Sequence, residues 1–423
     1  MKSKFLLSGI AFAAMAAASS ASAAELRFAC YQDGTECDAW AEQIKKFEAE
    51  NSGTTVVVDV VPYKTILEGL PVQLAAGEGP DLARVTDLGG LSKYMLDVTP
   101  HVKDAAAIEA AYGKTLAWTR TASPDDKGIY AIMDQQTATG PFVNKTLFDQ
   151  AGVALPAKGA TYEDWAKAAK EVADKTKTPF AVAMDRSGHR FAGPAISYGA
   201  KFFNADGTPI TVDEGFKAFA EKFVAWNGDG VIAKDVWGGS GGATYQDAAK
   251  EFTNGSLVMY ISGSWQIGRF GRDVGDAFDW LAVPAPCGPA GCTGIPGGAG
   301  IAGFKHTKAP EEVGKLIDFM AREDVQAAVL AKTKNIPANQ NLQAKGIAYE
   351  GATEAESAAL KVFAESLAEF SPVAFQIQGY PNNRAIFTAI VTRLTQAIVG
   401  ESTLDEALAR IDTDVKEALA AAK

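Results

Sequence analysis

Residues 251–265, E-F-T-N-G-S-L-V-M-Y-I-S-G-S-W, contain an apolar run that stops at Ser-Gly-Ser and then delivers a tryptophan. Ligands of open α/β sheets bind in the crevice outside the carboxyl ends of the strands. If the apolar run is a strand, Trp265 lies where a binding surface is expected. Its flat, rigid ring suits the face of a sugar. A core tryptophan at a strand end is the alternative that these residues leave open.

The first part of the chain alternates between strand and helix patterns. Residues 26–30, 54–61 and 81–85 have the apolar or β-branched character of strands, and residues 40–50 and 63–76 have helical spacing. Strands that alternate with helices in this way imply a parallel α/β sheet.

The pattern changes after residues 129–133, which indicates a second α/β unit. Residues 135–141 are polar and turn-rich, and we expect residues 142–144 to start a new strand. Thr161 is expected to cap a helix, with Asp164 in the capping-box position. Because about 400 residues are too many for one compact core, the chain is expected to form two domains. Further alternating segments are residues 146–151, 180–184, 216–226 and 247–252.

Two proline-containing extended segments are candidates for connections between the units. They are V-P-A-P at residues 283–286 and I-P-A-N at residues 336–339. Each proline fixes its own φ and biases the preceding residue toward extended geometry. With a crossing near Asp134, they predict hinge crossings near Pro284 and Pro337 and two discontinuous lobes. The predicted lobes are residues 24–133 with 283–335, and residues 134–282 with 336–423.

The first 23 residues have the pattern of a Sec-type signal peptide. Lys2 and Lys4 precede an apolar stretch at residues 5–18 and a small-residue run with an A-x-A site, so cleavage is expected after Ala23. The apolar stretch is too short to span a bilayer, and no other segment is long enough. A lipoprotein would require a cysteine at the cleavage point, and none stands there. We therefore expect a protein of the periplasm that is not embedded in the membrane.

The charge of the chain excludes some partners. The formal net charge is −11, and removal of the two signal-peptide lysines makes it −13. Such a surface repels nucleic acid and anionic lipid, although it says nothing about the charge inside a cleft. We expect no nucleic-acid partner and a monomeric protein.

Four cysteines form two short pairs, Cys30 with Cys37 and Cys287 with Cys292. In an oxidising compartment such cysteines are expected to form disulfides, and three connectivities are possible. We favour the two local pairs because each closes a small loop that contains glycine. A four-cysteine zinc site is the alternative, but it needs closer spacing in the first pair. We expect no metal site and no cofactor. The histidines are scattered, at His101, His189 and His306.

Several motifs occur in an order that resembles the family 1 extracellular solute-binding proteins, in particular their maltose-binding-protein-like group. This resemblance implies a two-lobed periplasmic-binding-protein fold of type II. It also implies that the protein captures an oligosaccharide by lobe closure and delivers it to the membrane permease subunits of an ABC transporter, without catalysis. The motifs are P-Y-K-T-I-L from Pro62, A-A-G-E-G-P-D-L from Ala75, G-I-Y-A-I from Gly128, F-V-N-K-T-L-F-D-Q-A-G-V from Phe142, residues 251–265, G-G-A-G from Gly297, A-P-E-E-V-G-K-L-I-D-F-M from Ala309 and N-I-P-A from Asn335.

The resemblance also implies a set of ligand contacts, most of them on loops that follow predicted strands. Trp265 matches the family's stacking aromatic residue. Tyr380 and Arg384 are four residues apart and would share a helical face, unless Pro381 starts the helix between them. The implied contacts are Tyr31, Gln32, Asp33, Arg84, Thr86, Asp87, Gln135, Thr137, Trp265, Gly298, Tyr380 and Arg384.

The segment D-R-S-G-H-R at residues 185–190 is the most unusual local feature. Arg186, His189 and Arg190 stand at the carboxyl end of a predicted strand, where guanidinium groups can hold a carboxylate. A neutral sugar does not need such groups. The alternative is that Asp185 pairs with one of the arginines on a solvated loop.

We therefore expect an acidic ligand such as a short uronide. The residues A-R-V-T-D-L-G-G-L-S-K-Y and M-D-R-S-G-H-R-F-A-G-P also resemble the branch of the family that binds α-1,4-digalacturonate. A neutral disaccharide or oligosaccharide is the alternative ligand.

A secreted glycosidase or polysaccharide lyase is the rival class. A glycosidase needs two facing carboxylates, and the candidates Asp33, Asp87 and Asp185 lie on separate loops. A lyase needs a positioned base, for which His189 or Arg190 is the candidate. Residues 238–242 formally fit G-x-S-x-G, but no convincing strand precedes them and no helix follows. We expect a binding protein and not an enzyme.

Overall fold

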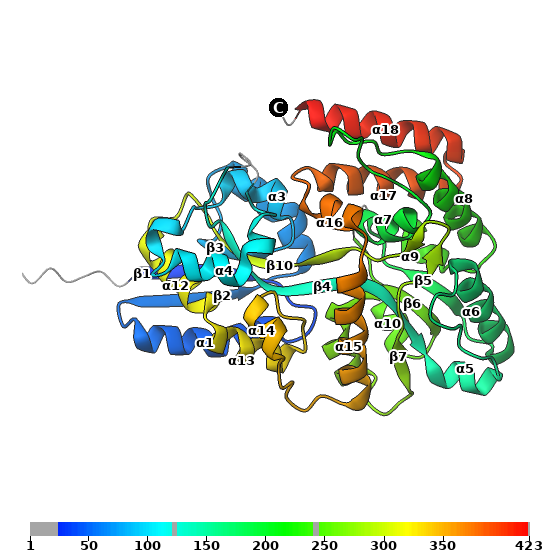
Figure 1. Cartoon of the computed structure of the whole chain (residues 1–423), viewed down its shortest axis with the longest axis horizontal. Coiled ribbons are helices and arrows are strands. Elements are labelled where there is room, and N and C mark those ends of the chain that lie inside the picture. The colour runs from blue at the N-terminus through cyan, green and yellow to red at the C-terminus, as the bar shows by residue number, and fades with distance from the viewer. Residues whose placement is uncertain (1–23, 121–124, 240–244, 422–423) are drawn as a thin grey trace, which may run out of the picture.

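The structure is a computed structural model that describes residues 24–120, 125–239 and 245–421 (Figure 1). The expected signal peptide, residues 1–23, lies outside the described residues, as do residues 240–242 of the glycine-rich loop. Within the described part of the chain, no helix has the length and apolar character needed to cross a membrane.

A mixed sheet of eight strands forms the framework. Its strand order is β2-β1-β3-β10-β4-β6-β5, and β7 also pairs with β4. The predicted parallel arrangement holds for β1, β2 and β3, whereas β10 is antiparallel to both of its neighbours. The strands are β1 (Ala24–Cys30), β2 (Thr54–Val60), β3 (Leu82–Val85), β4 (Ala131–Asn144), β5 (Phe180–Met184), β6 (Leu257–Gly263), β7 (Trp280–Ala282) and β10 (Pro296–Gly303).

The longest strand, β4, corrects the sequence prediction. We expected a turn-rich break at residues 135–141, but β4 runs unbroken through this segment and every residue in it is buried. Its first half pairs with β10, and its second half pairs with β6 and β7. These neighbours satisfy the backbone on both sides, so tertiary pairing overrides the turn preference of Gly140 and Pro141.

Two separate hydrophobic cores lie along this sheet. Figure 1 shows two halves of the molecule with β4 and β10 between them. We call the part around the first core, which includes Trp40 and Ile301, lobe 1. The part around the second core, which includes Phe142 and Ile390, is lobe 2.

The helices of lobe 1 pack around β1, β2, β3 and β10. They are α1 (Glu36–Glu50), α2 (Leu70–Ala75), α3 (Leu88–Leu91), α4 (Ala105–Leu116), α12 (Pro310–Ala321) and α13 (Glu323–Thr333), and α14 (Gln340–Lys345) contacts α4. The helices of lobe 2 are α5 (Lys145–Ala151), α6 (Tyr162–Thr176), α7 (Gly188–Ser197), α8 (Glu214–Gly228), α9 (Lys234–Gly238), α10 (Ala249–Thr253), α11 (Ile267–Asp273), α15 (Glu354–Glu369), α16 (Pro372–Gly379), α17 (Asn383–Val399) and α18 (Leu404–Ala421).

Three chain segments lie side by side between the lobes. Gln136 of β4 is paired with Gly298 of β10, and its backbone N–H donates to the carbonyl of Ile336 at 2.9 Å. The second crossing is therefore made by β10, and the predicted position near Pro284 differs from the structure. Residues 283–293 pack on lobe 2. Proline favours an extended chain but does not decide where that chain lies. The bounds of the lobes otherwise stay a prediction.

Both local disulfides are confirmed, so the zinc alternative is excluded. Cys30–Cys37 ties the last residue of β1 to the first turn of α1. Cys287–Cys292 closes a hairpin of two short strands, β8 (Cys287–Gly288) and β9 (Gly291–Cys292). The described residues contain no group of three or more His, Cys, Asp or Glu residues that could hold a metal ion.

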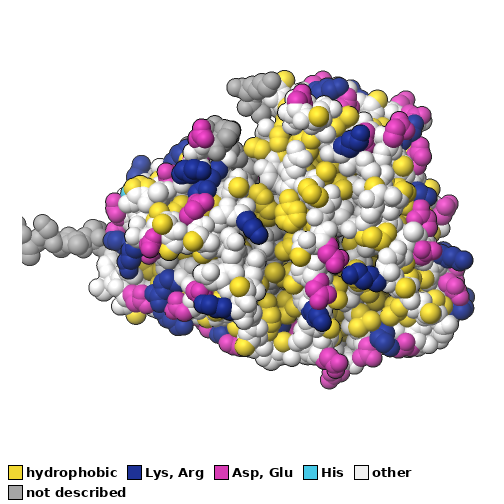
Figure 2. All heavy atoms as spheres, viewed as in Figure 1, with side chains coloured by type: hydrophobic (Ala, Val, Ile, Leu, Met, Phe, Trp, Pro, Cys, Tyr) yellow, Lys and Arg dark blue, Asp and Glu magenta, His cyan; other side chains and the backbone are white. Residues whose placement is uncertain are grey.

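The surface shows no segregation of charge by sign on the face seen in Figure 2, where basic and acidic side chains alternate around the edge of the molecule. Many of them form exposed ion pairs one helical turn apart, such as Lys145 with Asp149 and Lys170 with Asp174. Such pairs add little stability, so the fold depends mainly on its two cores.

Candidate ligand-binding site

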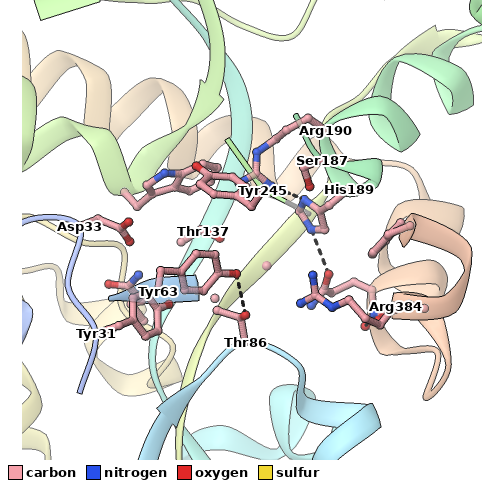
Figure 3. Close-up of a pocket in the computed structure, with 17 residues that line it drawn as sticks. Tyr31, Asp33, Tyr63, Thr86, Thr137, Ser187, His189, Arg190, Tyr245 and Arg384 are labelled. Atoms are coloured by element: carbon pink, nitrogen blue, oxygen red, sulfur yellow. Dashed lines mark hydrogen bonds between the residues drawn. The ribbon is translucent and has the colours of Figure 1, made fainter. Parts of the chain in front are cut away.

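A cavity lies between the two lobes, where the carboxyl ends of several strands meet. The space enclosed by its walls, open solvent included, is about 700 Å³. Figure 3 shows Arg190, His189 and Arg384 at one end and Asp33 at the other, with tyrosine rings between them. The predicted contacts that line the cavity are Tyr31, Asp33, Thr86, Gln135, Thr137, His189, Arg190, Trp265, Gly298 and Arg384.

Arg84 was predicted as a ligand contact, but it lies beneath the cavity wall and is fully buried. Its Nε forms an ion pair with Asp134 at 2.6 Å, and its Nη1 donates to the carbonyl of Tyr31 at 3.1 Å. The guanidinium also stacks on the Tyr31 ring, 4.4 Å from the centroid. Arg84 therefore holds Tyr31 in place and is itself closed off by Tyr31.

Four other predicted contacts also lie outside the cavity wall. Gln32 accepts a hydrogen bond from the backbone N–H of Cys37, and Asp87 caps α3. Arg186 donates to Thr395 on α17 and does not reach the cavity. Tyr380 packs against Phe203 instead of sharing a helical face with Arg384, because the chain is extended at Tyr380 and α17 begins only at Asn383.

Two tyrosines that were not predicted contribute large surfaces to the cavity. Tyr63 follows β2 in lobe 1, and its hydroxyl is 2.8 Å from the Thr86 hydroxyl. Its ring meets Tyr245 of lobe 2 edge-on, with centroids 5.5 Å apart. The two lobes thus touch across the cavity, so the structure represents a closed arrangement. Tyr63 was detectable from its place just after a predicted strand, whereas Tyr245 follows no recognisable element.

Other side chains of the wall were also missed. Ser187 and Gly297 adjoin predicted contacts, so their neighbours carried the signal. Gln378, Asn383 and Phe387 come from α16 and α17, where helix packing alone decides which residues face the cavity.

Trp265 lines the cavity, but its ring is almost completely covered. Only 7% of the residue is exposed. The Arg190 guanidinium lies over the ring, 4.1 Å from the centroid. The ring also passes so close to Gly263 that a Cβ at this glycine would lie 2.0 Å from it. In this arrangement of side chains the ring is therefore not free to stack on a sugar, and its role as a platform stays a prediction. Trp226, Trp237 and Trp280 belong to lobe 2 and do not line the cavity.

Arg190 is fixed by two hydrogen bonds. Its Nε donates to Asp185 at 3.4 Å, and its Nη1 is 2.6 Å from Nδ1 of His189. Asp185 is fully buried and also accepts hydrogen bonds from Tyr260, Ser262 and Tyr245. Burial raises the pKa of Asp185 to about 6, although Arg190 opposes this shift. Asp185 thus pairs with Arg190, as the alternative reading proposed, but inside the protein and not on a solvated loop.

His189 lies between the two arginines of the cavity. Its Nε2 faces the carbonyl of Pro296 at 3.1 Å and Oε1 of Gln378 at 3.0 Å. Burial, and then the charge of Arg190, lower the pKa of His189 well below its usual range. The imidazole is therefore neutral at physiological pH.

Arg384 extends from the first turn of α17 toward the cavity. Its Nε is 4.0 Å from Asp87, which is too far for a hydrogen bond, and has no hydrogen-bond partner among the described residues. Gly298 lines the cavity, and a Cβ at this position would lie 2.3 Å from the Gln135 carbonyl.

The Asp33 carboxyl lies at the far end of the cavity. Burial, and then the nearby Glu36 carboxylate, raise its pKa from the ordinary 3.8 to about 7. Between these values the folded protein binds a proton that the unfolded chain releases, so stability falls as the pH rises and then levels off above about 7. Asp33→Asn removes this titration. Its advantage in unfolding free energy should grow between pH 4 and 7, by at most about 1.4 kcal/mol per unit, and then stay constant. Urea denaturation at several pH values measures this difference, and a pH-independent difference would contradict it.

Comparison with known proteins identifies the family. Residues 42–357, about three quarters of the chain, match the model of the bacterial extracellular solute-binding proteins. The chain belongs to this family. A protein of Brucella abortus named only as a binding protein is 26% identical over 350 residues, which cover 79% of this chain and 80% of that protein. The multiple sugar-binding protein of Streptococcus mutans is 26% identical over 255 residues, 55% of this chain and 56% of that protein.

The fold of this solute-binding protein is also that of solved structures. An ABC substrate-binding protein of Listeria monocytogenes in complex with cycloalternan superimposes with a TM-score of 0.78, covers 94% of this chain and 99% of its own, and is 19% identical. The predicted two-lobed α/β fold is thereby confirmed.

Proposed function

We propose that this solute-binding protein is the periplasmic component of a carbohydrate ABC importer and that it captures an acidic oligosaccharide of the digalacturonate type. The family supports the binding role, and the sugars in the names of its relatives support a carbohydrate ligand. The observation that carries the acidic ligand is the pair Arg190 and Arg384 at one end of the cavity, on either side of His189 (Figure 3).

The acidic preference depends on donors and not on net charge. Arg190 is paired with Asp185, and Arg384 faces Asp87 at a distance, so the cavity is not strongly basic. The guanidinium N–H groups that these carboxylates do not use can still bind a carboxylate in the bidentate manner. At the other end, Asp33, Gln135 and Thr137 can accept or donate hydrogen bonds to hydroxyls, which a neutral sugar would also use.

Transport requires closure of the lobes around the sugar. The structure is closed by the contact between Tyr63 and Tyr245, and the three segments beside Gln136 are the hinge in this proposal. A sugar that touches both lobes shifts the population toward the closed form, which then docks on the permease. The signal-peptide pattern expected for residues 1–23 supports the proposed periplasmic location.

The arrangement does not favour catalysis. Of the three carboxylates considered for a glycosidase, only Asp33 lines the cavity, since Asp185 lies behind Arg190 and Asp87 caps α3. A lyase base at His189 would need a free nitrogen, and both of its ring nitrogens have protein partners.

Calorimetric titration with digalacturonate and with maltose tests the ligand. We expect saturable binding of the uronide and no heat with maltose. Tight binding of maltose without binding of digalacturonate would replace the acidic ligand by a neutral one. New reducing or unsaturated ends after incubation with pectic oligomers would instead reveal an enzyme.

A further inference from the structure

At the basic end of the cavity, His189, Arg190 and Trp265 have different roles. We propose that His189 is a positioning residue that holds the Arg190 guanidinium over the Trp265 ring, so that Arg190 and not the indole face receives the ligand. This inference rests on the proposed acidic ligand. It assigns to Trp265 the support of an arginine in place of the stacking of a sugar.

The contacts of the two ring nitrogens of His189 determine its tautomer. Nε2 of His189 faces two oxygen acceptors, the Pro296 carbonyl and Oε1 of Gln378, so this nitrogen must carry the hydrogen. In a neutral ring Nδ1 is then an acceptor. The 2.6 Å contact from Arg190 Nη1 to Nδ1 is therefore a hydrogen bond that the guanidinium donates. One tautomer satisfies every contact that the ring nitrogens make.

The charged groups around the His189 ring oppose its protonation. Arg190 on α7 and Arg384 on α17 both act on His189 electrostatically, and the first turn of α17 also contributes the ring of Phe387, 5.5 Å from the imidazole. The nearest carboxylate, Asp185, is bound to Arg190. A protonated imidazole would thus face two cations and lose its acceptor, and Arg190 would lose its lateral anchor.

Three neighbouring side chains fix the position of the Arg190 guanidinium. Asp185 fixes Nε, His189 fixes Nη1, and Trp265 supports the plane from one side. An arginine has five N–H donors in a rigid fork, and those not used by Asp185 and His189 remain for the cavity. Only 11% of the Arg190 side chain is exposed, so a carboxylate that reaches it does so largely without water.

The arrangement also restricts how a sugar can bind. Since Arg190 lies over the indole and only 7% of Trp265 is exposed, a pyranose cannot stack on this ring unless Arg190 moves. The other aromatic side chains that line the cavity are Tyr31, Tyr63, Tyr245 and Phe387. We therefore place the sugar rings against the tyrosines and the carboxylate on Arg190.

Two variants of His189 separate positioning from packing. His189→Asn places an amide oxygen near the position of Nδ1 and can still accept from Arg190, whereas His189→Gln reaches the position of Nε2 and loses this acceptor. We expect digalacturonate affinity within about threefold of wild type for H189N, and a loss of about ten- to a hundredfold for H189Q. Calorimetry gives both values, and thermal unfolding of each variant reports whether it is folded.

The outcomes distinguish this inference from the proposed function. If wild type fails to bind digalacturonate, the acidic ligand itself is wrong. If wild type binds it but H189Q keeps full affinity, or both variants lose equal affinity, the positioning role is wrong and the imidazole serves packing or its bond to Pro296. Should H189Q not fold, Arg190→Lys replaces it, since a lysine keeps the charge but cannot be held flat between Trp265 and His189. A loss below threefold in that variant would overturn the inference.

Discussion

Arg190→Ala should raise the Kd for digalacturonate by about a hundredfold or more. Hydrogen bonds to a charged group contribute about 1.5–3 kcal/mol each, and a carboxylate on a guanidinium fork forms two of them. The substitution also leaves the ligand carboxylate in a site that water hardly reaches, which adds to the loss. Isothermal titration at fixed salt measures the change, and binding of any neutral sugar should change little.

Arg186→Ala is the matched control for this variant. Arg186 belongs to the same six-residue segment and carries the same charge, but it bonds to Thr395 and does not line the cavity. Its removal should leave the Kd within about twofold, because a distant charge is screened. Equal losses in the two variants would mean that general electrostatic attraction, and not contact with Arg190, provides the preference for acidic ligands.

Asp134→Ala should lower the free energy of unfolding by about 3–5 kcal/mol, the largest change in stability that we expect. Asp134 is the ion-pair partner of the fully buried Arg84 and also accepts from the indole N–H of Trp40 at 3.3 Å. Without it, the guanidinium would be an uncompensated charge in the core of lobe 1. Urea denaturation provides the measurement. The same variant should bind ligand more weakly, since Arg84 holds Tyr31 in the cavity wall.

Asp87→Ala provides the comparison. Asp87 lies outside the cavity wall, caps a single helical turn and is 4.0 Å from Arg384. Loss of a helix cap costs about 1 kcal/mol. A similar cost for both substitutions would show that the pair of Arg84 and Asp134 is hydrated in solution and not closed off.

Local patterns were sufficient to predict much of this molecule. The first three strands, the capping box at Thr161 and both disulfides depend on residues close together in sequence, and the structure contains all of them. Strand ends also indicated part of the cavity wall, including Tyr31, Thr86 and Trp265, because parallel strands bring their carboxyl ends together.

The errors concern contacts between distant segments. The polar residues 135–141 form a strand only because β10 and β6 flank them, and neither neighbour can be inferred from these seven residues. Trp265 lines the cavity, but the guanidinium that covers it comes from α7, far away in sequence. Arg84 was assigned to the ligand because its partner Asp134 lies in another strand.

The continuity of β4 has a consequence for how the protein folds. Because one strand is shared by both cores, neither half can lose its part of the sheet without stripping backbone partners from the other. The two halves should therefore unfold as a single cooperative unit and not as independent domains. A destabilising substitution in either core therefore lowers the stability of the whole chain. Such a substitution can reduce the amount of active protein, even far from the cavity, without altering ligand selectivity.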